Sequence, residues 1–201
     1  MDKAQVAAIL DDTGNLLELT GASPFETRAY QNAARIIGAM EGDIEELVRS
    51  GGIAQVSGVG KTLAARITEL VTTGRMGLYD KLVAETPPGL REMLRIPGLG
   101  PKRVRQISEA LNIATVADLR AACENGRVAE LPGFGAKSQE KILKGLDFLS
   151  QHGDKYRFDV AESGALAVAE ALRALPQVVR LSVAGSLRRK KDVVKDIDVV
   201  A

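Results

Sequence analysis

The sequence predicts a mainly α-helical chain that ends in the start of an α/β unit. Apolar residues recur at helical spacing through the first 150 positions, where a Gly-x-Gly segment occurs three times. After residue 151 a helical stretch, expected at 162–175, is followed by two short segments of strand character, 178–183 and 196–200. We therefore expect two helical domains, at 1–80 and 81–150, and an α/β region at 151–201.

The second predicted helix illustrates how the helical elements are placed. It is expected to begin at Ser23-Pro24, because serine caps a helix and proline is favoured at its first position. Its apolar side chains are expected to face the core: Phe25, Tyr30, Ala33, Ile36 and Ile37.

A repeat occupies the middle of the chain. Three segments align without gaps: VSGVGKTLAARI at 56–67, IPGLGPKRVRQI at 96–107 and LPGFGAKSQEKI at 131–142. In each, an apolar residue stands between two glycines, and an amphipathic stretch follows. Glycine permits positive φ and a close approach by another backbone, so each segment predicts a tight hairpin before a helix. Free amides of the hairpin and of the first helical turn can then bind a phosphate.

These segments resemble the helix-hairpin-helix module of DNA-binding proteins that do not read sequence. The resemblance implies that the glycines and the residue between them approach the DNA backbone while nearby bases neutralise it. The candidate DNA-binding residues are Gly58, Val59, Gly60, Lys61, Gly98, Leu99, Gly100, Lys102, Arg103, Gly133, Phe134, Gly135 and Lys137. The stretch GVGKT at 58–62 also looks like the end of a P-loop, but that motif needs a glycine where Gln55 stands.

The last 18 residues carry a second group of polar side chains. Alternation along a strand puts Asp196 and Asp198 on one face, where two carboxylates can bind Mg²⁺. Gly185-Ser186 offers amides and a hydroxyl to a polyphosphate, and Arg188 and Arg189 add charged donors. The pattern favours metal-assisted phosphoryl or nucleotidyl transfer.

Together these motifs resemble family X DNA polymerases, the group that includes DNA polymerase beta, and most closely their bacterial branch. The resemblance implies that Asp196 and Asp198 are two of three catalytic ligands for Mg²⁺ or Mn²⁺. It also implies that Gly185, Ser186, Arg188 and Arg189 bind the incoming deoxynucleoside triphosphate. The first hairpin would grip DNA near the 5′-phosphate of a gap, and the second would grip the primer strand. A monovalent cation at the hairpin loops is a further cofactor that the resemblance allows.

Members of that family with 5′-deoxyribose-phosphate lyase activity use a lysine where this chain has Arg66. A guanidinium stays protonated and cannot form a Schiff base. Tyr30 and Lys61 complete the candidate 5′-phosphate or lyase pocket, but Lys61 stands on the hairpin rather than at the expected position. The sequence therefore does not support lyase chemistry.

The family's third catalytic carboxylate would follow residue 201, so we expect an N-terminal portion that cannot extend a primer alone. Two alternatives stay open: a non-catalytic tandem helix-hairpin-helix DNA-binding protein, and a small nucleotidyltransferase with another acceptor. The polymerase interpretation uses both halves of the sequence, and it predicts gapped or nicked duplex DNA as the partner.

Composition sets the remaining expectations. With 27 basic and 26 acidic side chains the net charge is +1, so binding to an anionic partner must come from local patches. A single cysteine excludes an internal disulfide, and neither a signal peptide nor a membrane span is apparent. We expect a monomeric, cytoplasmic, nucleoid-associated protein.

Overall fold

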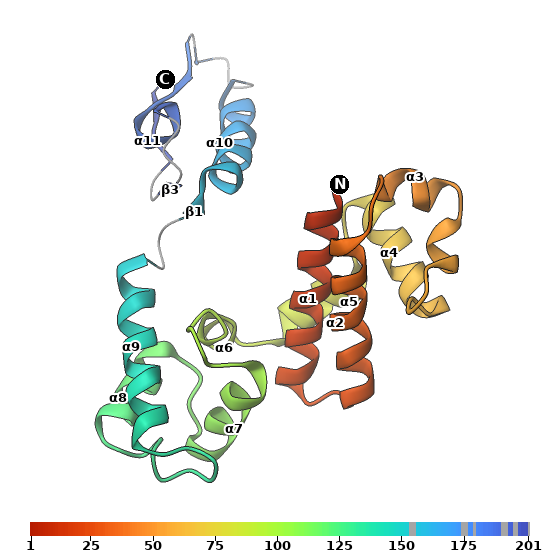
Figure 1. Cartoon of the computed structure of the whole chain (residues 1–201). Coiled ribbons are helices and arrows are strands. Elements are labelled where there is room, and N and C mark those ends of the chain that lie inside the picture. Colours follow the sequence, from red (N-terminus) through yellow and green to blue (C-terminus); the bar gives the residue numbers. More distant parts are fainter. Residues whose placement is uncertain (153–155, 174–176, 179, 190–192, 195–196, 201) are drawn as a thin grey trace. The chain divides into compact units, whose positions relative to one another are not determined.

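The computed structural model describes residues 1–152, 156–173, 177–178, 180–189, 193–194 and 197–200. The described part is mainly helical, as the sequence predicts (Figure 1). By its internal contacts the chain divides into two compact units, Met1–Leu146 and Asp147–Ala201. None of the described helices is both long enough and apolar enough to cross a membrane.

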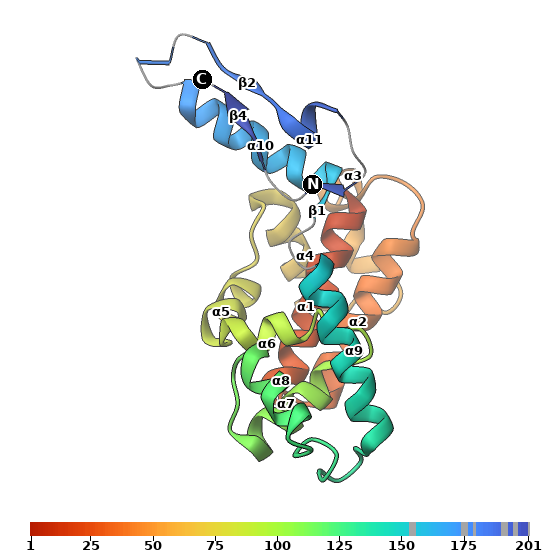
Figure 2. The same ribbon diagram turned by 90° about the vertical axis from the view of Figure 1, so that its left-hand side faces the viewer.

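Five α-helices and a 3₁₀ helix build the first part of the larger unit (Figure 2). They are α1 (Lys3–Thr20), α2 (Pro24–Ala39), α3 (Ile44–Arg49), η1 (Gly52–Gln55), α4 (Lys61–Thr73) and α5 (Gly77–Glu85). Their buried faces share one core that includes Val6, Leu10, Leu17, Ile37 and Ile67. Helices α1 and α2 pack closely at Gly14, where a Cβ would lie 2.9 Å from Cγ of Gln31.

Side chains and glycines cap the helices of the larger unit, and the helix start predicted at Ser23-Pro24 is among them. Asp2 and Gln5 make a capping box at the start of α1. At the start of α2, the Ser23 side chain accepts a hydrogen bond of 3.2 Å from the Glu26 amide, and Pro24 is the first helical residue. Gly21 ends α1 with a φ of 82°, which only glycine adopts readily.

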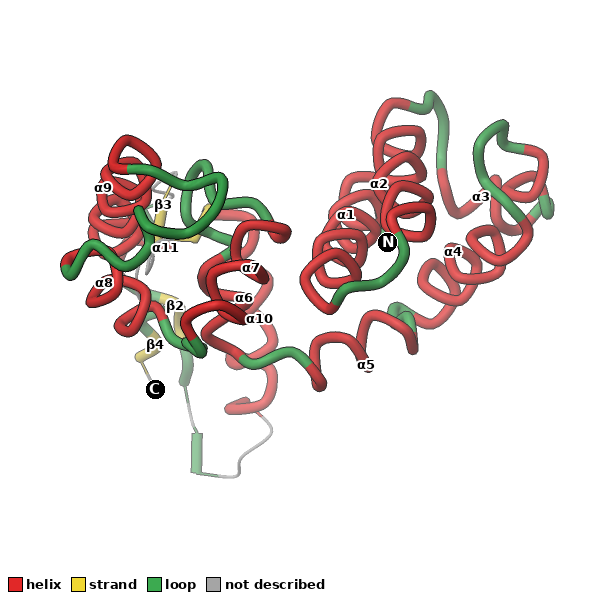
Figure 3. The backbone as a smooth tube through the Cα atoms, turned by 90° about the horizontal axis from the view of Figure 1, so that it is seen from below, coloured by secondary structure: helices red, strands yellow, loops and turns green. Residues whose placement is uncertain are grey.

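Four further helices complete the larger unit (Figure 3). They are α6 (Pro88–Met93), α7 (Pro101–Leu111), α8 (Val116–Glu124) and α9 (Ala136–His152). The buried side chains of this region include Met93, Ile107 and Leu119 on the helices and Ile96 and Leu99 in the hairpin between α6 and α7. Helix α9 lies against the second hairpin: a Cβ on Gly145 would be 2.6 Å from Cγ2 of Ile96.

In the smaller unit, α10 (Phe158–Arg173) is the long helix and α11 (Gly185–Arg188) is a single turn. Strand β1 (Tyr156–Arg157) pairs antiparallel with β3 (Val193–Val194), and β2 (Ser182–Val183) pairs antiparallel with β4 (Val199–Val200). The strands are shorter than the sequence predicts. Among the described residues of the expected segment 178–183, the last two are strand, and Gly-Ser begins the helical turn α11.

We predict that Gly145→Ala destabilises the larger unit. The added methyl meets a buried Ile96 side chain at 2.6 Å and the carbonyl oxygen of Pro97 at 3.3 Å. Overpacking of this kind costs about 1–3 kcal/mol, which outweighs the higher helix propensity of alanine. The measurement is the midpoint of thermal unfolding.

Gly38→Ala in α2 is the matched control. Its Cβ would meet only Cβ of Ala7, at an ordinary 3.5 Å, so stability should rise by up to about 1 kcal/mol. Equal effects of the two substitutions would contradict the packing role of Gly145.

Candidate nucleic-acid interface

The three hairpins share one turn geometry. In each, the amide of the residue between the glycines donates to the carbonyl three residues earlier: Val59 to Val56 at 3.0 Å, Leu99 to Ile96 at 3.1 Å and Phe134 to Leu131 at 3.0 Å. The first glycines, Gly58, Gly98 and Gly133, have φ values of 87°, 80° and 79°. Positive φ at the third position, after serine or proline, is typical of a type II turn.

A helix begins directly after the second glycine of every hairpin: α4 at Lys61, α7 at Pro101 and α9 at Ala136. Gly60 and Gly100 are the N-caps of the first two helices, and neither has a side chain that caps the first-turn amides. The first amides of a helix lack partners within the helix. These helix starts can therefore donate hydrogen bonds to an anion.

The second glycines have no reason within the chain to be glycine. The backbone angles of Gly60 (φ −73°, ψ 165°) and Gly100 (φ −78°, ψ 167°) are open to any residue. A Cβ on Gly60, Gly100 or Gly135 would meet no atom within 4 Å. The missing side chain instead leaves open space beside the free amides.

The residue between the glycines differs among the hairpins. Val59 and Leu99 are buried, with 6% and 2% of their surface exposed. Phe134 is only half-buried, and the guanidinium of Arg103 lies 5.3 Å from the centre of its ring. This cation–π contact and a 2.7 Å hydrogen bond from Gln106 to the Pro132 carbonyl connect the second and third hairpins.

The lysines that follow the hairpins are exposed. Lys61, Lys102 and Lys137 form no hydrogen bond or ion pair with any residue that the structure describes. They lie within the first two residues of the helices α4, α7 and α9. Each hairpin thus combines free amides with one mobile cation nearby.

The candidate lyase pocket is partly assembled. The charge of Arg66 on α4 acts on the buried Tyr30 of α2 and lowers its pKa, and Nη1 of Arg66 lies 3.4 Å from Oε2 of Glu69. Glu69 also accepts a 2.8 Å hydrogen bond from the Gly77 amide. Lys61 lies exposed at the start of the same helix and is not a member of this network.

The smaller unit brings two predicted site residues together. The main-chain amide of Ala184 donates to the carbonyl oxygen of Asp198 at 2.8 Å. Gly185 has a φ of 59°, and a Cβ on it would lie 2.7 Å from Cγ of Asp198, so only glycine fits beside this carboxylate. Arg188 and Arg189 are exposed at the end of α11.

Asp196 and Ser186 are the other predicted residues of that site. Asp196 lies outside the described residues, so its expected position on the strand face beside Asp198 stays a prediction. Ser186 belongs to the backbone of α11. Within the residues described, no group of three or more acidic, histidine or cysteine side chains is placed to hold a metal ion.

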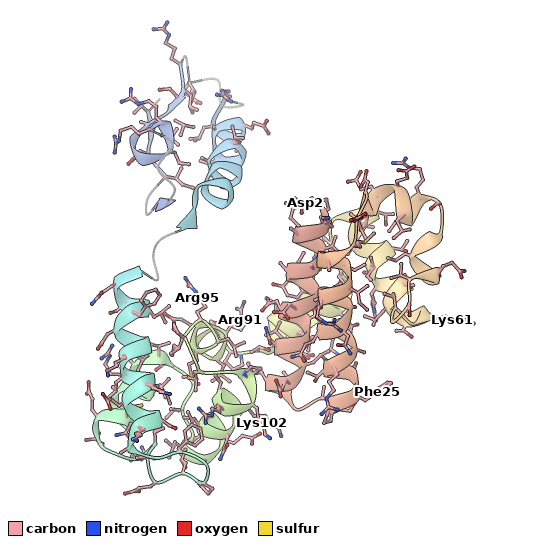
Figure 4. All side chains as sticks on the ribbon, in the orientation of Figure 1. Asp2, Phe25, Lys61, Arg91, Arg95 and Lys102 are labelled. Atoms are coloured by element: carbon pink, nitrogen blue, oxygen red, sulfur yellow. The ribbon has the colours of Figure 1, made fainter. Side chains whose placement is uncertain are left out.

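The sequence interpretation placed Phe25 in the core, which is wrong: 85% of its surface is exposed at the start of α2 (Figure 4). At 3.6 residues per turn, five positions before Tyr30 is roughly 140° around the helix. Since Tyr30 is buried, that offset was the signal that Phe25 faces outward. An exposed aromatic ring of this kind can stack on a base.

Family comparisons agree with the hairpin geometry. Residues 1–76 match the family described as "Helix-hairpin-helix domain", and residues 90–147 match the family "SAM-like Helix-hairpin-helix tandem". The two helical regions are therefore helix-hairpin-helix domains.

Relatives extend the comparison to the whole chain. It is 32% identical over 200 residues to the DNA polymerase/3'-5' exonuclease PolX of Bacillus subtilis (strain 168). The matched region is 100% of this chain and 35% of PolX. The predicted resemblance to family X DNA polymerases is thereby confirmed, and the chain spans about a third of that relative's length.

Shorter similarities involve the RuvA subunit of the Holliday junction branch migration complex. The Acidovorax ebreus (strain TPSY) subunit is 27% identical over 99 residues, which are 49% of this chain and 52% of that protein. The Leptothrix cholodnii (strain ATCC 51168 / LMG 8142 / SP-6) subunit is 35% identical over 66 residues, which are 33% of this chain and 35% of that protein.

We predict that Arg66→Met raises the pKa of Tyr30 further. Burial already raises this pKa above 10, while the charge of Arg66 lowers it. Removal of the cation leaves burial less opposed, so the phenol should ionise at a higher pH. The measurement is an NMR titration of the Tyr30 ring carbons.

Arg49→Met is the control, since Arg49 is an exposed arginine outside this network. An unchanged or lower pKa of Tyr30 in Arg66→Met would contradict the contact between the two side chains.

Proposed function

We propose that this chain forms the DNA-binding part of a family X DNA polymerase that fills gaps in duplex DNA. The observation that carries the proposal is the open space at the second glycine of each hairpin. Gly60, Gly100 and Gly135 have neither strained φ nor a close neighbour within the chain. A ligand backbone that approaches the helix-start amides explains why a side chain is missing there.

The predicted assignments of the site residues follow as part of the proposal. The first hairpin and Lys61 hold the downstream strand of a gap near its 5′-phosphate, with Tyr30 and Arg66 beside it. The second hairpin holds the primer strand. In the smaller unit, Gly185, Ser186, Arg188 and Arg189 hold a deoxynucleoside triphosphate, and Asp196 with Asp198 holds Mg²⁺ or Mn²⁺, which would activate the primer hydroxyl.

A non-catalytic DNA-binding protein is the second candidate, since tandem hairpins alone account for it. The apposition of Gly185 and Asp198 favours the polymerase, because a DNA-binding module does not need a carboxylate packed against a glycine turn. The alternative is favoured if deoxynucleoside triphosphate with Mg²⁺ causes no chemical-shift change at residues 184–189 and 198.

Fluorescence anisotropy with labelled duplexes tests the DNA partner. We expect tighter binding to a duplex with a one-nucleotide gap than to an intact duplex of the same sequence. Affinity should also fall as salt rises, because binding releases counterions from the phosphates. Equal affinity for both duplexes would exclude the proposed role at gaps.

Gly60→Ala and Gly100→Ala are each expected to weaken DNA binding by roughly tenfold, because a methyl group displaces the phosphate from charge-assisted amide hydrogen bonds. Both positions accept the alanine backbone, so the cost to stability should be at most about 1 kcal/mol. Anisotropy and thermal unfolding are measured on the same samples.

Gly38→Ala, which lies outside the hairpins, should leave DNA affinity unchanged. If Gly60→Ala and Gly100→Ala bind gapped DNA as tightly as the parent chain, the hairpins do not contact the phosphate backbone.

Phe25→Ala should reduce affinity for gapped DNA more than for intact duplex. A base that lacks a stacking neighbour at a gap can stack on the exposed ring, and such stacking contributes about 1–3 kcal/mol. Phe25→Leu, an apolar side chain without a ring face, is the matched variant and should lose nearly as much. Retained affinity in Phe25→Leu would point to general apolar contact instead of stacking.

A further inference from the structure

A pocket of about 330 Å³ lies where the end of α1 and the start of α2 meet α7. Its polar wall is formed by Glu18, Thr27, Arg28, Gln31, Lys102 and Arg105. The volume is at the lower end of the 300–1,000 Å³ typical of small-molecule sites. None of the residues assigned to the first hairpin or to the triphosphate site belongs to this wall.

The wall carries more positive than negative charge. Three cationic side chains line this wall, those of Arg28, Lys102 and Arg105, against a single carboxylate, that of Glu18. The Nε atom of Arg105 also pairs at 2.7 Å with Glu109, which lies outside the wall. Arg28 and Lys102 have no hydrogen bond or ion pair with any residue in the described ranges, so their charges are available to a ligand.

Arg105 is fixed in place by the end of α1. A Cβ on Gly21 would lie 2.7 Å from Cζ of Arg105, so the guanidinium rests directly on the glycine backbone. Gly21 is also the left-handed C-cap of α1, so its backbone conformation and its contact with Arg105 each favour glycine. The arginine thus connects α7 to the junction between α1 and α2.

Thr27 supplies the observation that points to a ligand. Only 5% of its surface is exposed, and its Oγ1 atom is buried without a hydrogen-bond partner. A buried hydroxyl without a partner costs stability. Thr27 lines the pocket, and a rotation of its side chain would bring the enclosed hydroxyl to a ligand oxygen there.

We propose that this pocket binds a phosphate group through Thr27, Arg28 and Lys102, with Arg105 behind it. A phosphate oxygen accepts from both a hydroxyl and charged donors, and the positive start of the 16-residue helix α2 lies at the same place. Lys102 directly follows the second hairpin, so the phosphate of a bound strand is the natural source. Only the identification of a DNA strand as the source of the phosphate rests on the proposed function.

The first experiment titrates the isotope-labelled chain with inorganic pyrophosphate and follows the backbone amides of residues 27, 28 and 102. Arg28→Ala should weaken binding by about tenfold, because it removes a charge-assisted hydrogen bond. Thr27→Val keeps the shape and should weaken it by roughly threefold while thermal stability stays equal or rises. Arg35→Ala is the control, an exposed arginine two turns along α2 and outside the wall.

The second experiment repeats these variants with labelled gapped DNA. Parallel losses for pyrophosphate and DNA identify a phosphate of the DNA strand as the ligand. A loss with pyrophosphate alone identifies a free phosphate compound, and either result supports the pocket. If neither titration distinguishes Arg28→Ala or Thr27→Val from Arg35→Ala, the proposal is overturned.

Failure of the pocket and failure of the proposed function are distinguishable. DNA binding that depends on Gly100, in a chain where neither DNA nor pyrophosphate binding depends on Arg28 or Thr27, would overturn the pocket and leave the function standing. Pyrophosphate binding that depends on Arg28, in a chain with no affinity for DNA, would support the pocket and overturn the function.

Discussion

A left-handed glycine within a four-residue turn determines where the helix after each hairpin begins. Gly58, Gly98 and Gly133 reverse the chain, and one amide-to-carbonyl hydrogen bond closes every turn. The helix then starts two residues after the last residue of the turn. The residue before the helix is a glycine, which has no side chain to cap the first amides. The same constraint that makes the reversal possible therefore leaves unsatisfied amides at the surface. Structure and binding capacity arise from one local feature.

Packing then determines how independent the hairpins are. Val59 is buried in the core shared by α1 to α5. The second and third hairpins are connected to one another through Arg103, Phe134 and the hydrogen bond from Gln106. Arg103 was predicted to bind DNA, but its guanidinium also lies over the Phe134 ring and so helps to connect the second and third hairpins. Lys102, its neighbour, keeps its charge available.

The sequence predicts local features better than distant contacts, and particular residues show why. The turn glycines and the Ser23 cap depend on a few neighbouring residues, so the pattern of letters was sufficient. Phe25 was misplaced because an aromatic residue was assumed to be buried without regard to its angle on the helix. The strands proved short, since strand length depends on pairing partners that alternation does not reveal. The influence of Arg66 on Tyr30, 36 positions away, and the placement of Arg28 and Lys102 on one pocket wall depend on tertiary structure and could not be predicted.

Nearly balanced charge is compatible with DNA binding when the main chain supplies the donors. When lysine and arginine supply the affinity, binding depends steeply on salt. The logarithm of the binding constant falls by about 0.9 per neutralised phosphate for each tenfold rise in salt concentration. Amides at a helix start bind phosphate with partial charges and fixed geometry, so fewer cations are needed. Lys61, Lys102 and Lys137 place a full charge beside each hairpin. A net charge of +1 is therefore compatible with DNA binding, because cations lie beside the hairpins. Binding at three hairpins can hold a DNA backbone without reading its bases.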